Sequence, residues 1–510
     1  MGSLAAFGRL LGAGAILVRN DALLPRELDH LYPARVRTLA DALRTYAGPG
    51  ARQGRPGERL ARSLERLGPV GVKLGQLLST RADIFGAAFV EDLSHLKDKL
   101  APFPTDAARR EVETALGRPV DSLFASFGEP VAAASLAQAH DAVLADGRRV
   151  AVKVLRPGVE QRVARDAEVL TLAARLMERW FPLSRRLEPQ ALAATVIRAT
   201  ELELDLRLEA AGADELGEVM ARDGYMSAPT VVWDGVGKRV LTLAWAEGVA
   251  LTDPSALEQP GLERKAVADN LVRAFLAQAL DHGVFHADLH EGNLFVAPPG
   301  RVIAVDFGII GRLGPAERRY LAEILYGFLE RDYDKIARVH FEAGYVPARH
   351  SVAAFAQALR AVGEPIFGRN ARDVSMSRLL TQLFEITALF DMHLRPELVL
   401  LQKTMMTVEG VARRIDPDHD LWAAADPVVR RWMTRELSPA ARVRTLADDA
   451  TRVLRGLARR LDEPATPAVV VAPVAAPALD AEARRLAALG WFAAGAAIAG
   501  AAFFLGVLFR

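Results

Sequence analysis

The segment from His286 to Asn293 carries the residues with the clearest chemistry in the chain. It reads His-Ala-Asp-Leu-His-Glu-Gly-Asn, and Asp306-Phe307-Gly308 follows thirteen residues after the asparagine. Phosphoryl transfer needs a carboxylate beside the accepting oxygen and oxygen ligands for Mg²⁺. Asp288 fits the first need, and Asn293 and Asp306 fit the second. The combined spacing is typical of a catalytic loop, a short hairpin and a metal-binding turn.

A metal-hydrolase-like cluster is the alternative interpretation of the same segment. Its ligands would be His282, His286, Asp288 and His290. A metal site of that kind needs a further ligand set from elsewhere in the chain, and these histidines have none. The cluster would also leave the Asp-Phe-Gly sequence without a role. Phosphoryl transfer is therefore the favoured interpretation.

A lysine upstream of the segment His286–Asn293, here called the catalytic segment, is a candidate for binding nucleotide phosphates. Val150-Ala151-Val152-Lys153 predicts a strand that carries Lys153 to the α- and β-phosphates. A Gly-rich loop is expected before such a strand. Here its place is taken by Ala132, Ala133, Ala134 and Ser135. Alanine reaches less φ space than glycine, so we expect a stiffer loop that holds nucleotide differently.

Lys153 needs a carboxylate partner on a helix, and Glu209 is the candidate. It follows Glu201 and Asp205 at spacings of four residues, which places the three carboxylates on one acidic stripe of a helix. A solvated helix face is the alternative interpretation of that stripe. The separation of 56 positions between Lys153 and Glu209 indicates an inserted helical segment at about 160–200.

Hydrophobic periodicity predicts the elements that position these residues. Two short strands are joined by an Asp-Gly turn at Ala145-Asp146-Gly147, and helices dominate elsewhere except for the polar patch at 281–311. The expected helices are Val72–Thr80, Ala88–Lys97, Thr105–Leu116, 160–222 and much of 249–460; the expected strands are Gln138–Leu144, Arg149–Val154, Thr230–Val232 and Arg239–Ala244.

Composition excludes several classes of protein. The 510 residues contain no cysteine, which rules out disulfides, thiolate metal sites and cysteine nucleophiles. Lys and Arg number 64 against 63 Asp and Glu, so the basic excess expected of a nucleic-acid-binding protein is absent. The hydrophobic fraction of 51% excludes a wholly disordered chain.

Several motifs in the expected order make the chain resemble the UbiB (AarF/ABC1) family of atypical protein-kinase-like proteins. Lys73-Leu74-Gly75-Gln76 matches the family's Lys-x-Gly-Gln signature, and Glu203-Leu204-Asp205 matches its Glu-x-Asp signature. The Ala-rich loop and the segments at 286–293 and 306–309 match its nucleotide, catalytic and metal motifs. The resemblance implies that Lys73, Gln76 and Glu203 lie near the nucleotide and hinder access of a protein substrate.

The resemblance also implies ATP and Mg²⁺ as cofactors and a role in ubiquinone biosynthesis. We expect an ATPase or kinase that handles quinone or lipid precursors. The alternative is a pseudokinase scaffold that organises membrane enzymes of quinone biosynthesis. A true protein kinase is disfavoured by the Ala-rich loop. The expected partners are membrane lipid, a quinone-like small molecule or its precursor and quinone-biosynthesis enzymes, with no nucleic acid.

Both ends of the chain carry apolar segments. The run Leu10–Val18 is too short to span a bilayer and predicts an amphipathic helix on the protein or on a membrane. Residues 1–70 hold 11 Arg against 6 acidic residues. This basic excess indicates a solvated helix face or, alternatively, a surface that faces anionic lipid. Residues 463–479 contain four prolines and predict an extended linker. The uncharged run 486–509 predicts a transmembrane helix, with a buried globular helix as the alternative.

The expected fold class is α+β: a two-lobed kinase-like fold with an N-terminal helical extension, a helix-rich C-lobe and a C-terminal transmembrane helix. The positive-inside rule then puts the protein in the inner membrane as a single-pass protein with a cytoplasmic catalytic domain. The expected units are an N-terminal extension (1–128), an N-lobe with a helical insertion (129–250), a C-lobe with trailing helices (251–462), a Pro/Ala linker (463–485) and the membrane helix (486–509).

Overall fold

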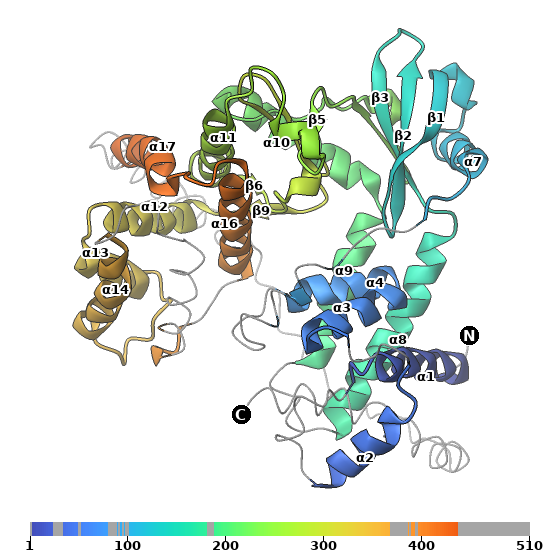
Figure 1. Ribbon diagram of the computed structural model, residues 1–510, viewed down its shortest axis with the longest axis horizontal. Helices are drawn as coiled ribbons and strands as arrows, with labels where there is room; N and C mark the ends of the chain where they lie inside the picture. Colours follow the sequence, from blue (N-terminus) through green and yellow to red (C-terminus); the bar gives the residue numbers. More distant parts are fainter. Residues whose placement is uncertain are drawn as a thin grey trace, which may run out of the picture.

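An antiparallel sheet forms the core of the smaller lobe in the computed structural model (Figure 1). Its strands run in the order β1 (Phe124–Ala133), β2 (Ala137–Leu144), β3 (Arg149–Leu155) and β4 (Val240–Ala244). Helix α7 (Thr105–Leu116) packs on one face, where Val112 meets a cluster of buried strand residues.

The structure describes residues 3–23, 34–48, 53–79, 89, 92, 93, 96, 101–180, 188–367, 386, 389–392 and 396–436.

The β2–β3 hairpin has the turn that the sequence predicts. Asp146 accepts a hydrogen bond from the Arg148 backbone, and Gly147 has a φ of 88°, a conformation that favours glycine. On β3, Val150, Val152 and Val154 are buried, while Lys153 points to the opposite face. Strand alternation thus sends the lysine away from the α7 core.

The predicted helical segment at 160–222 consists of three helices. They are α8 (Val159–Trp180), α9 (Pro189–Glu203) and α10 (Leu206–Asp223). The chain leaves helical geometry at Leu204, and the Asp205 side chain caps α10 by accepting a hydrogen bond from the Arg207 backbone N–H. The prediction of one acidic helical stripe from Glu201 to Glu209 was therefore wrong.

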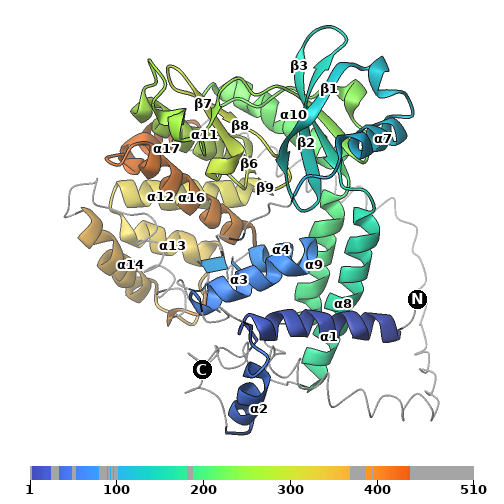
Figure 2. The ribbon, with the colours of Figure 1, turned by 45° about the vertical axis from the view of Figure 1, so that its right-hand side comes forward.

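Helices of the N-terminal extension pack against the inserted helices α8 and α9 through α1 and α4 (Figure 2). They are α1 (Ser3–Arg19), α2 (Ala34–Arg44), α3 (Pro56–Leu67) and α4 (Pro69–Leu78). Helix α1 contacts α8 through Leu10, and α4 contacts α9. A side chain at Gly75 of α4 would meet Leu64 and Leu96 at less than 3.0 Å, so glycine permits the close α3–α4 contact. The predicted helix Ala88–Lys97 lies mostly outside the described residues.

The larger lobe is mainly helical. A three-stranded sheet of β5 (Val249–Ala250), β7 (Leu294–Ala297) and β8 (Arg301–Ala304) and the pair β6 (Val284–His286) and β9 (Ile310–Arg312) frame the polar patch. The helices around them are α11 (Arg264–Ala277), α12 (Pro315–Leu329), α13 (Tyr333–Glu342), α14 (Val352–Phe367), α16 (Pro396–Ile415) and α17 (Leu421–Glu436).

Part of the basic excess in the first 70 residues is buried. The Arg59 side chain has no exposed surface, and Arg44 is 4% exposed. Both guanidinium groups lie near the buried carboxylate of Asp21, within 4 Å. Arg9 forms an ion pair with Glu168 on α8. These three contacts are structural, so the arginine count overstates how much of this region can face anionic lipid.

The sequence-based prediction of a membrane anchor is corrected. Among the described residues, no helix is long and apolar enough to cross a membrane. Helix α1 is apolar, but its 17 residues span about 26 Å against a hydrocarbon core of about 30 Å. The predicted helix at 486–509 lies outside the described residues, as does the predicted linker at 463–485. The single-pass anchor and the inner-membrane localisation based on it are therefore withdrawn.

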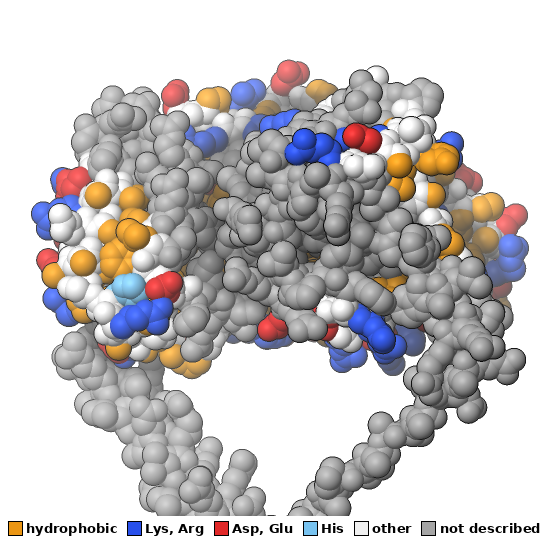
Figure 3. Space-filling model, turned by 90° about the horizontal axis from the view of Figure 1, so that it is seen from below, with side chains coloured by type: hydrophobic (Ala, Val, Ile, Leu, Met, Phe, Trp, Pro, Cys, Tyr) orange, Lys and Arg blue, Asp and Glu red, His pale blue; other side chains and the backbone are white. Residues whose placement is uncertain are grey.

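Charges of both signs share the described surface. On the face seen from below (Figure 3), basic, acidic and hydrophobic side chains are interspersed over the coloured atoms. This mixture agrees with the near-zero net charge of +1. The described part of this face therefore presents no broad field of one sign.

Candidate functional site

The Lys153 ammonium is shared by two carboxylates. Its Nζ lies 2.7 and 2.9 Å from the two carboxylate oxygens of Glu209 and 3.4 Å from Asp306 Oδ2. Lys153 comes from β3, Glu209 from the first turn of α10 and Asp306 from the loop after β8. The three residues are far apart in the sequence, and the structure brings them together where the two lobes meet.

Helix α10 approaches the Asp306 loop closely because it carries a glycine. A side chain at Gly212 would meet Ile310 Cδ1 at 2.4 Å, and the Phe307 carbonyl oxygen lies within 3.4 Å of the same point. Asp306 itself has a φ of 62°, a left-handed conformation that is uncommon for residues other than glycine. Its Oδ1 accepts a hydrogen bond from the Gly308 backbone at 3.3 Å. This strained turn aims the carboxylate at Lys153.

Sharing one ammonium separates the acidities of the two carboxyl groups. Lys153 holds the pKa of Asp306 below its ordinary value. Burial raises the pKa of Glu209 from 4.5 to about 7, against the attraction of Lys153. Burial alone would lower the pKa of Lys153, but the two carboxylates outweigh burial and raise it. At neutral pH the lysine and Asp306 are charged, while Glu209 is poised to titrate.

Four hydrogen bonds fix the backbone around Asp288. The Ala287 N–H donates to the Ile309 carbonyl at 3.1 Å, and the Ala287 carbonyl accepts from Thr404 Oγ1 at 3.1 Å. The Asp288 N–H donates to His286 Nδ1 at 3.1 Å, and the Asp288 carbonyl accepts from Asn293 Nδ2 at 3.0 Å. The Asp288 carboxylate stays partly exposed and lies 3.6 Å from His290 Nε2. Its backbone is held while its side chain faces outward.

The residues predicted to bind Mg²⁺ have suitable chemistry. The buried Asn293 donates its amide N–H to the Asp288 carbonyl, which leaves its side-chain oxygen available to a cation. Asp306 is an ionised carboxylate, half-exposed at 50%. Hard cations prefer such oxygens, and Mg²⁺ usually retains several waters and phosphate ligands beside one or two protein groups. The donor set fits Mg²⁺ bound together with a nucleotide.

His286 is a structural residue in this arrangement. Its ring is buried, accepts at Nδ1 from the Asp288 N–H and lies with Nε2 3.3 Å from the Val305 carbonyl. Burial lowers its pKa, which favours a neutral ring with the proton on Nε2. His282 instead pairs with Asp223. No group of three metal-ligating side chains of the His, Cys, Asp and Glu types occurs in the described part of the chain, which argues against the metal-hydrolase alternative.

A second lysine–glutamate pair lies beside the first. Lys73 on α4 donates a hydrogen bond to Glu203 at the end of α9. Burial raises the pKa of Glu203, and the charges of Asp306 and Lys153 also act on it. Lys73 and Glu203 therefore lie within electrostatic range of the Lys153 site. Gln76 is half-buried one turn further along α4, and no side-chain contact to another described residue places it in the site.

The Ala-rich segment forms the end of β1 and the turn into β2. Ala132 and Ala133 close the strand, and Ala134 and Ser135 begin the turn. All four keep φ outside the left-handed region. The Ala134 N–H donates to the Ala137 carbonyl at 2.8 Å, and the Ala134 carbonyl accepts from Arg156. This amide is occupied within the turn, so a phosphate cradle here would have fewer donors than a Gly-rich loop offers.

Sequence reasoning missed the contribution of α16. Thr404 is buried and bonds to the catalytic segment, and Lys403 precedes it. Lys403 carries a charge within a largely apolar helix, Leu-Gln-Lys-Thr-Met-Met at 401–406. That isolated charge was the only sequence feature by which Lys403 could have been recognised as a candidate site residue. Its position near Asp288 depends on tertiary packing and could not be found from spacing.

Family profiles match most of the described chain. Residues 95–340 match the ABC1 atypical kinase-like domain, and residues 359–420 match the UbiB helical domain. Among solved structures, the erythromycin complex of Rv3197 from Mycobacterium tuberculosis is similar, with a TM-score of 0.50 and 25% identity over 70% of this chain and 90% of that chain. Together with the lobes and the lysine–glutamate pair, these matches define an atypical kinase-like protein.

Curated relatives identify the family. A protein named "Probable protein kinase UbiB" from Marinobacter nauticus is 41% identical over 76% of this chain and 72% of its own. Proteins of the same name from Cellvibrio japonicus and Pseudomonas paraeruginosa are 39% and 38% identical, covering 86% and 88% of this chain and 80% and 86% of their own lengths. The chain belongs to the UbiB family, as the sequence motifs predicted.

Proposed function

We propose that this protein binds ATP with Mg²⁺ beside Lys153 and turns ATP over in support of ubiquinone biosynthesis. The observation that carries the proposal is the Lys153 ammonium held between Glu209 and Asp306, at 2.7 and 3.4 Å. Kinase-like phosphoryl transfer needs both the lysine–glutamate pair and the metal-binding aspartate in place. A chain that had lost this chemistry would have no need to keep the three groups together.

Each residue has a role in this proposal. Lys153 contacts the nucleotide phosphates, and Glu209 holds the lysine in position. Asn293 and Asp306 bind Mg²⁺, which neutralises phosphate charge when it is bound. Asp288 orients the accepting oxygen of water or of a small molecule, because its backbone is held by four hydrogen bonds and its carboxylate is partly exposed.

The Lys73–Glu203 pair supports a small acceptor rather than a protein. The pair ties α4 of the N-terminal extension to α9, within electrostatic range of Asp306. Helix α4 therefore lies near the place where a peptide would approach. A quinone-like phenol or a lipid precursor is the proposed acceptor or ligand, and enzymes of quinone biosynthesis are the proposed partners.

ATP turnover measured with and without added ligands tests the proposal. The full-length protein is assayed alone, with anionic vesicles and with a quinone-like phenol, beside Asp288→Asn and a matched control, Asp121→Asn, at an exposed position. We expect turnover in the wild type and the control, stimulation by the ligands, and loss of turnover in Asp288→Asn. Absence of turnover in the wild type, or full turnover in Asp288→Asn, contradicts the proposal and favours a scaffold.

A further inference from the structure

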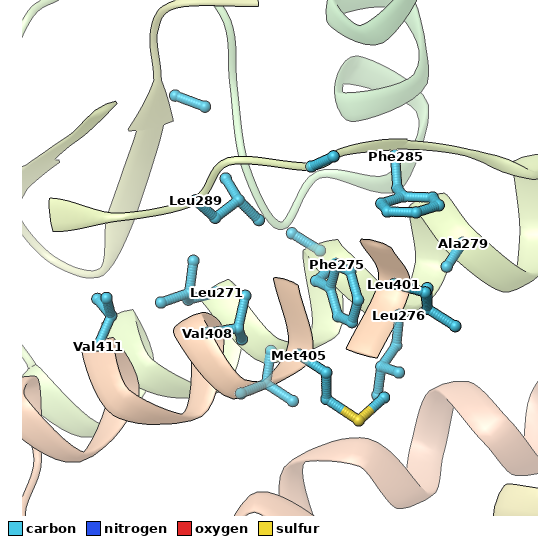
Figure 4. Close-up of a cluster of buried hydrophobic side chains, with 14 of the residues drawn as sticks. Leu271, Phe275, Leu276, Ala279, Phe285, Leu289, Leu401, Met405, Val408 and Val411 are labelled. Carbon is cyan, nitrogen blue, oxygen red and sulfur yellow. The ribbon is translucent and has the colours of Figure 1, made fainter. Parts of the chain in front are cut away.

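Helix α16 and the catalytic segment form one packed unit. Phe285 and Leu289, which flank Asp288, lie over Leu271 and Phe275 of α11, and Leu401, Met405 and Val408 of α16 join the same cluster (Figure 4). Thr404 adds a buried hydrogen bond to the Ala287 carbonyl at 3.1 Å. The position of α16 relative to Asp288 is therefore fixed by packing and by a polar contact.

One face of α16 borders the catalytic segment. Lys403 and Arg414 are eleven residues apart, and eleven steps of about 100° return to the same face of a helix. Arg414 forms an ion pair with Glu291, three residues after Asp288. Lys403 therefore lies on the same face as Arg414, in the middle of the helix and next to Thr404, whose hydroxyl bonds to the Ala287 carbonyl.

Lys403 forms no direct ion pair in the part of the chain that the structure describes, although the Asp288 carboxylate lies within electrostatic range. Of the nearby lysines, Lys153 is paired with Glu209 and Lys73 with Glu203. Lys403 is half-buried, and its ammonium forms no ion pair or hydrogen bond with another described side chain. Burial lowers its pKa, while the Asp288 carboxylate acts in the opposite direction and Lys73 adds to the burial effect. A partly buried cation without a direct ion-pair partner favours binding of an anion.

We infer that Lys403 binds the terminal phosphate of the nucleoside triphosphate beside Asp288. The inference rests on the proposed function, because it requires a nucleotide at Lys153. The catalytic segment contains no Lys or Arg between Asp288 and Asn293, so it supplies no cation to the terminal phosphate itself. A phosphoryl group that is being transferred needs positive charge around its oxygens. Helix α16 supplies that charge from outside the kinase-like segment.

Comparison of triphosphate and diphosphate binding tests the inference. Dissociation constants for AMP-PNP and for ADP, both with Mg²⁺, are measured by calorimetry on the full-length protein. The variants are Lys403→Met, which removes the charge at similar length, Lys403→Arg, which keeps it, and Lys335→Met, a control whose ammonium lies over the Tyr326 ring on α12. Melting temperatures verify that each variant is folded.

We expect Lys403→Met to weaken AMP-PNP binding about tenfold, the loss of one charge-assisted hydrogen bond, and to leave ADP binding unchanged. Lys403→Arg should retain most of the wild-type affinity for AMP-PNP, and Lys335→Met should bind both nucleotides as the wild type does. Equal weakening for both nucleotides, or none, overturns the inference while leaving the proposed function intact. If the wild type binds neither nucleotide, the proposed function fails and the inference fails with it.

Discussion

Replacing Glu209 by Gln removes the titrating carboxyl from the Lys153 site at nearly constant shape. The side chain is 9% exposed and shares Lys153 with Asp306. In the folded protein, burial raises the pKa of Glu209 to about 7 from an ordinary value of 4.5. A raised pKa means that the fold favours the neutral carboxyl. Ionisation of Glu209 therefore destabilises the fold, and the substitution abolishes that effect.

The sign and size of the effect follow from the two pKa values. The stabilisation is fully present below pH 4.5 and is lost as pH rises to about 7. At about 1.4 kcal/mol per pH unit, the whole change amounts to about 3 kcal/mol. About 2 kcal/mol of it falls between pH 5.5 and pH 8. For a chain of this size, 2 kcal/mol corresponds to a change in melting temperature of about 4 °C or less.

Differential scanning fluorimetry from pH 5.5 to pH 8 without nucleotide provides the assay. We expect the melting temperature of the wild type to fall with rising pH relative to that of Glu209→Gln. The matched control is Glu215→Gln on the same helix, whose carboxylate pairs with Arg312 at the surface and whose pKa is lowered by that hydrogen bond. Parallel pH profiles for the wild type and Glu209→Gln would refute the reasoning.

Three further predictions concern the metal, the Ala-rich turn and helix packing. Asp306→Asn should lose the Mg²⁺ dependence of nucleotide binding, since an amide is a poorer ligand for hard cations; an unchanged thermal shift with Mg-ATP would contradict this. Ala133→Gly should tighten ATP binding by somewhat under tenfold in calorimetry, because glycine lets amides turn toward phosphate; equal affinity would remove residues 132–135 from the phosphate site. Gly75→Ala should destabilise the protein by about 1–3 kcal/mol, because its methyl group would clash with Leu64. The control Gly410→Ala on α16 has open space around the new methyl group and should leave stability unchanged. Equal melting temperatures for the two variants would contradict the packing argument.

The order of the chemical groups along the chain could be predicted because each motif is local. The segment around Asp288, the Asp306 turn and the Lys153 strand are recognisable from short spacings. The β2–β3 hairpin follows from its Asp-Gly turn and from the alternation of buried valines. What the sequence could not supply is the sharing of Lys153 by two carboxylates, because that contact joins three elements by tertiary packing.

Strand β1 was not predicted because its sequence breaks the pattern of a strand. Gly128 and Pro130 interrupt it, and both residues are depleted in regular strands. The structure shows irregular pairing with β2 at three places along β1. Exposed and buried residues do not alternate there, since the strand lies at the edge of the sheet. Sheet formation with β2 overrides a weak local preference.

The membrane prediction shows the limit of hydropathy. The run at 486–509 satisfies the length and charge criteria for a spanning helix, yet a count of apolar residues says nothing about where the segment packs. Lys403 shows a second limit, because no sequence pattern indicates its position near Asp288. A single lysine in an apolar helix, 115 residues after Asp288, carries no motif, and its relevance depends on the packing of α16 against the catalytic segment.

The break between α9 and α10 explains how two glutamates so close in sequence contact different lysines. On a continuous helix, Glu203 and Glu209 would point about 120° apart, since six residues advance the helix by about 600°. The chain instead ends α9 at Glu203, which faces Lys73, and restarts after the Asp205 cap, so that Glu209 in the first turn of α10 faces Lys153. The alternation of Glu and Leu from 201 to 204 has a period of two, which does not favour a continuous helix. The Lys73–Glu203 contact of the N-terminal extension and the Lys153–Glu209 contact of the kinase-like lobe therefore lie on either side of one short junction between α9 and α10.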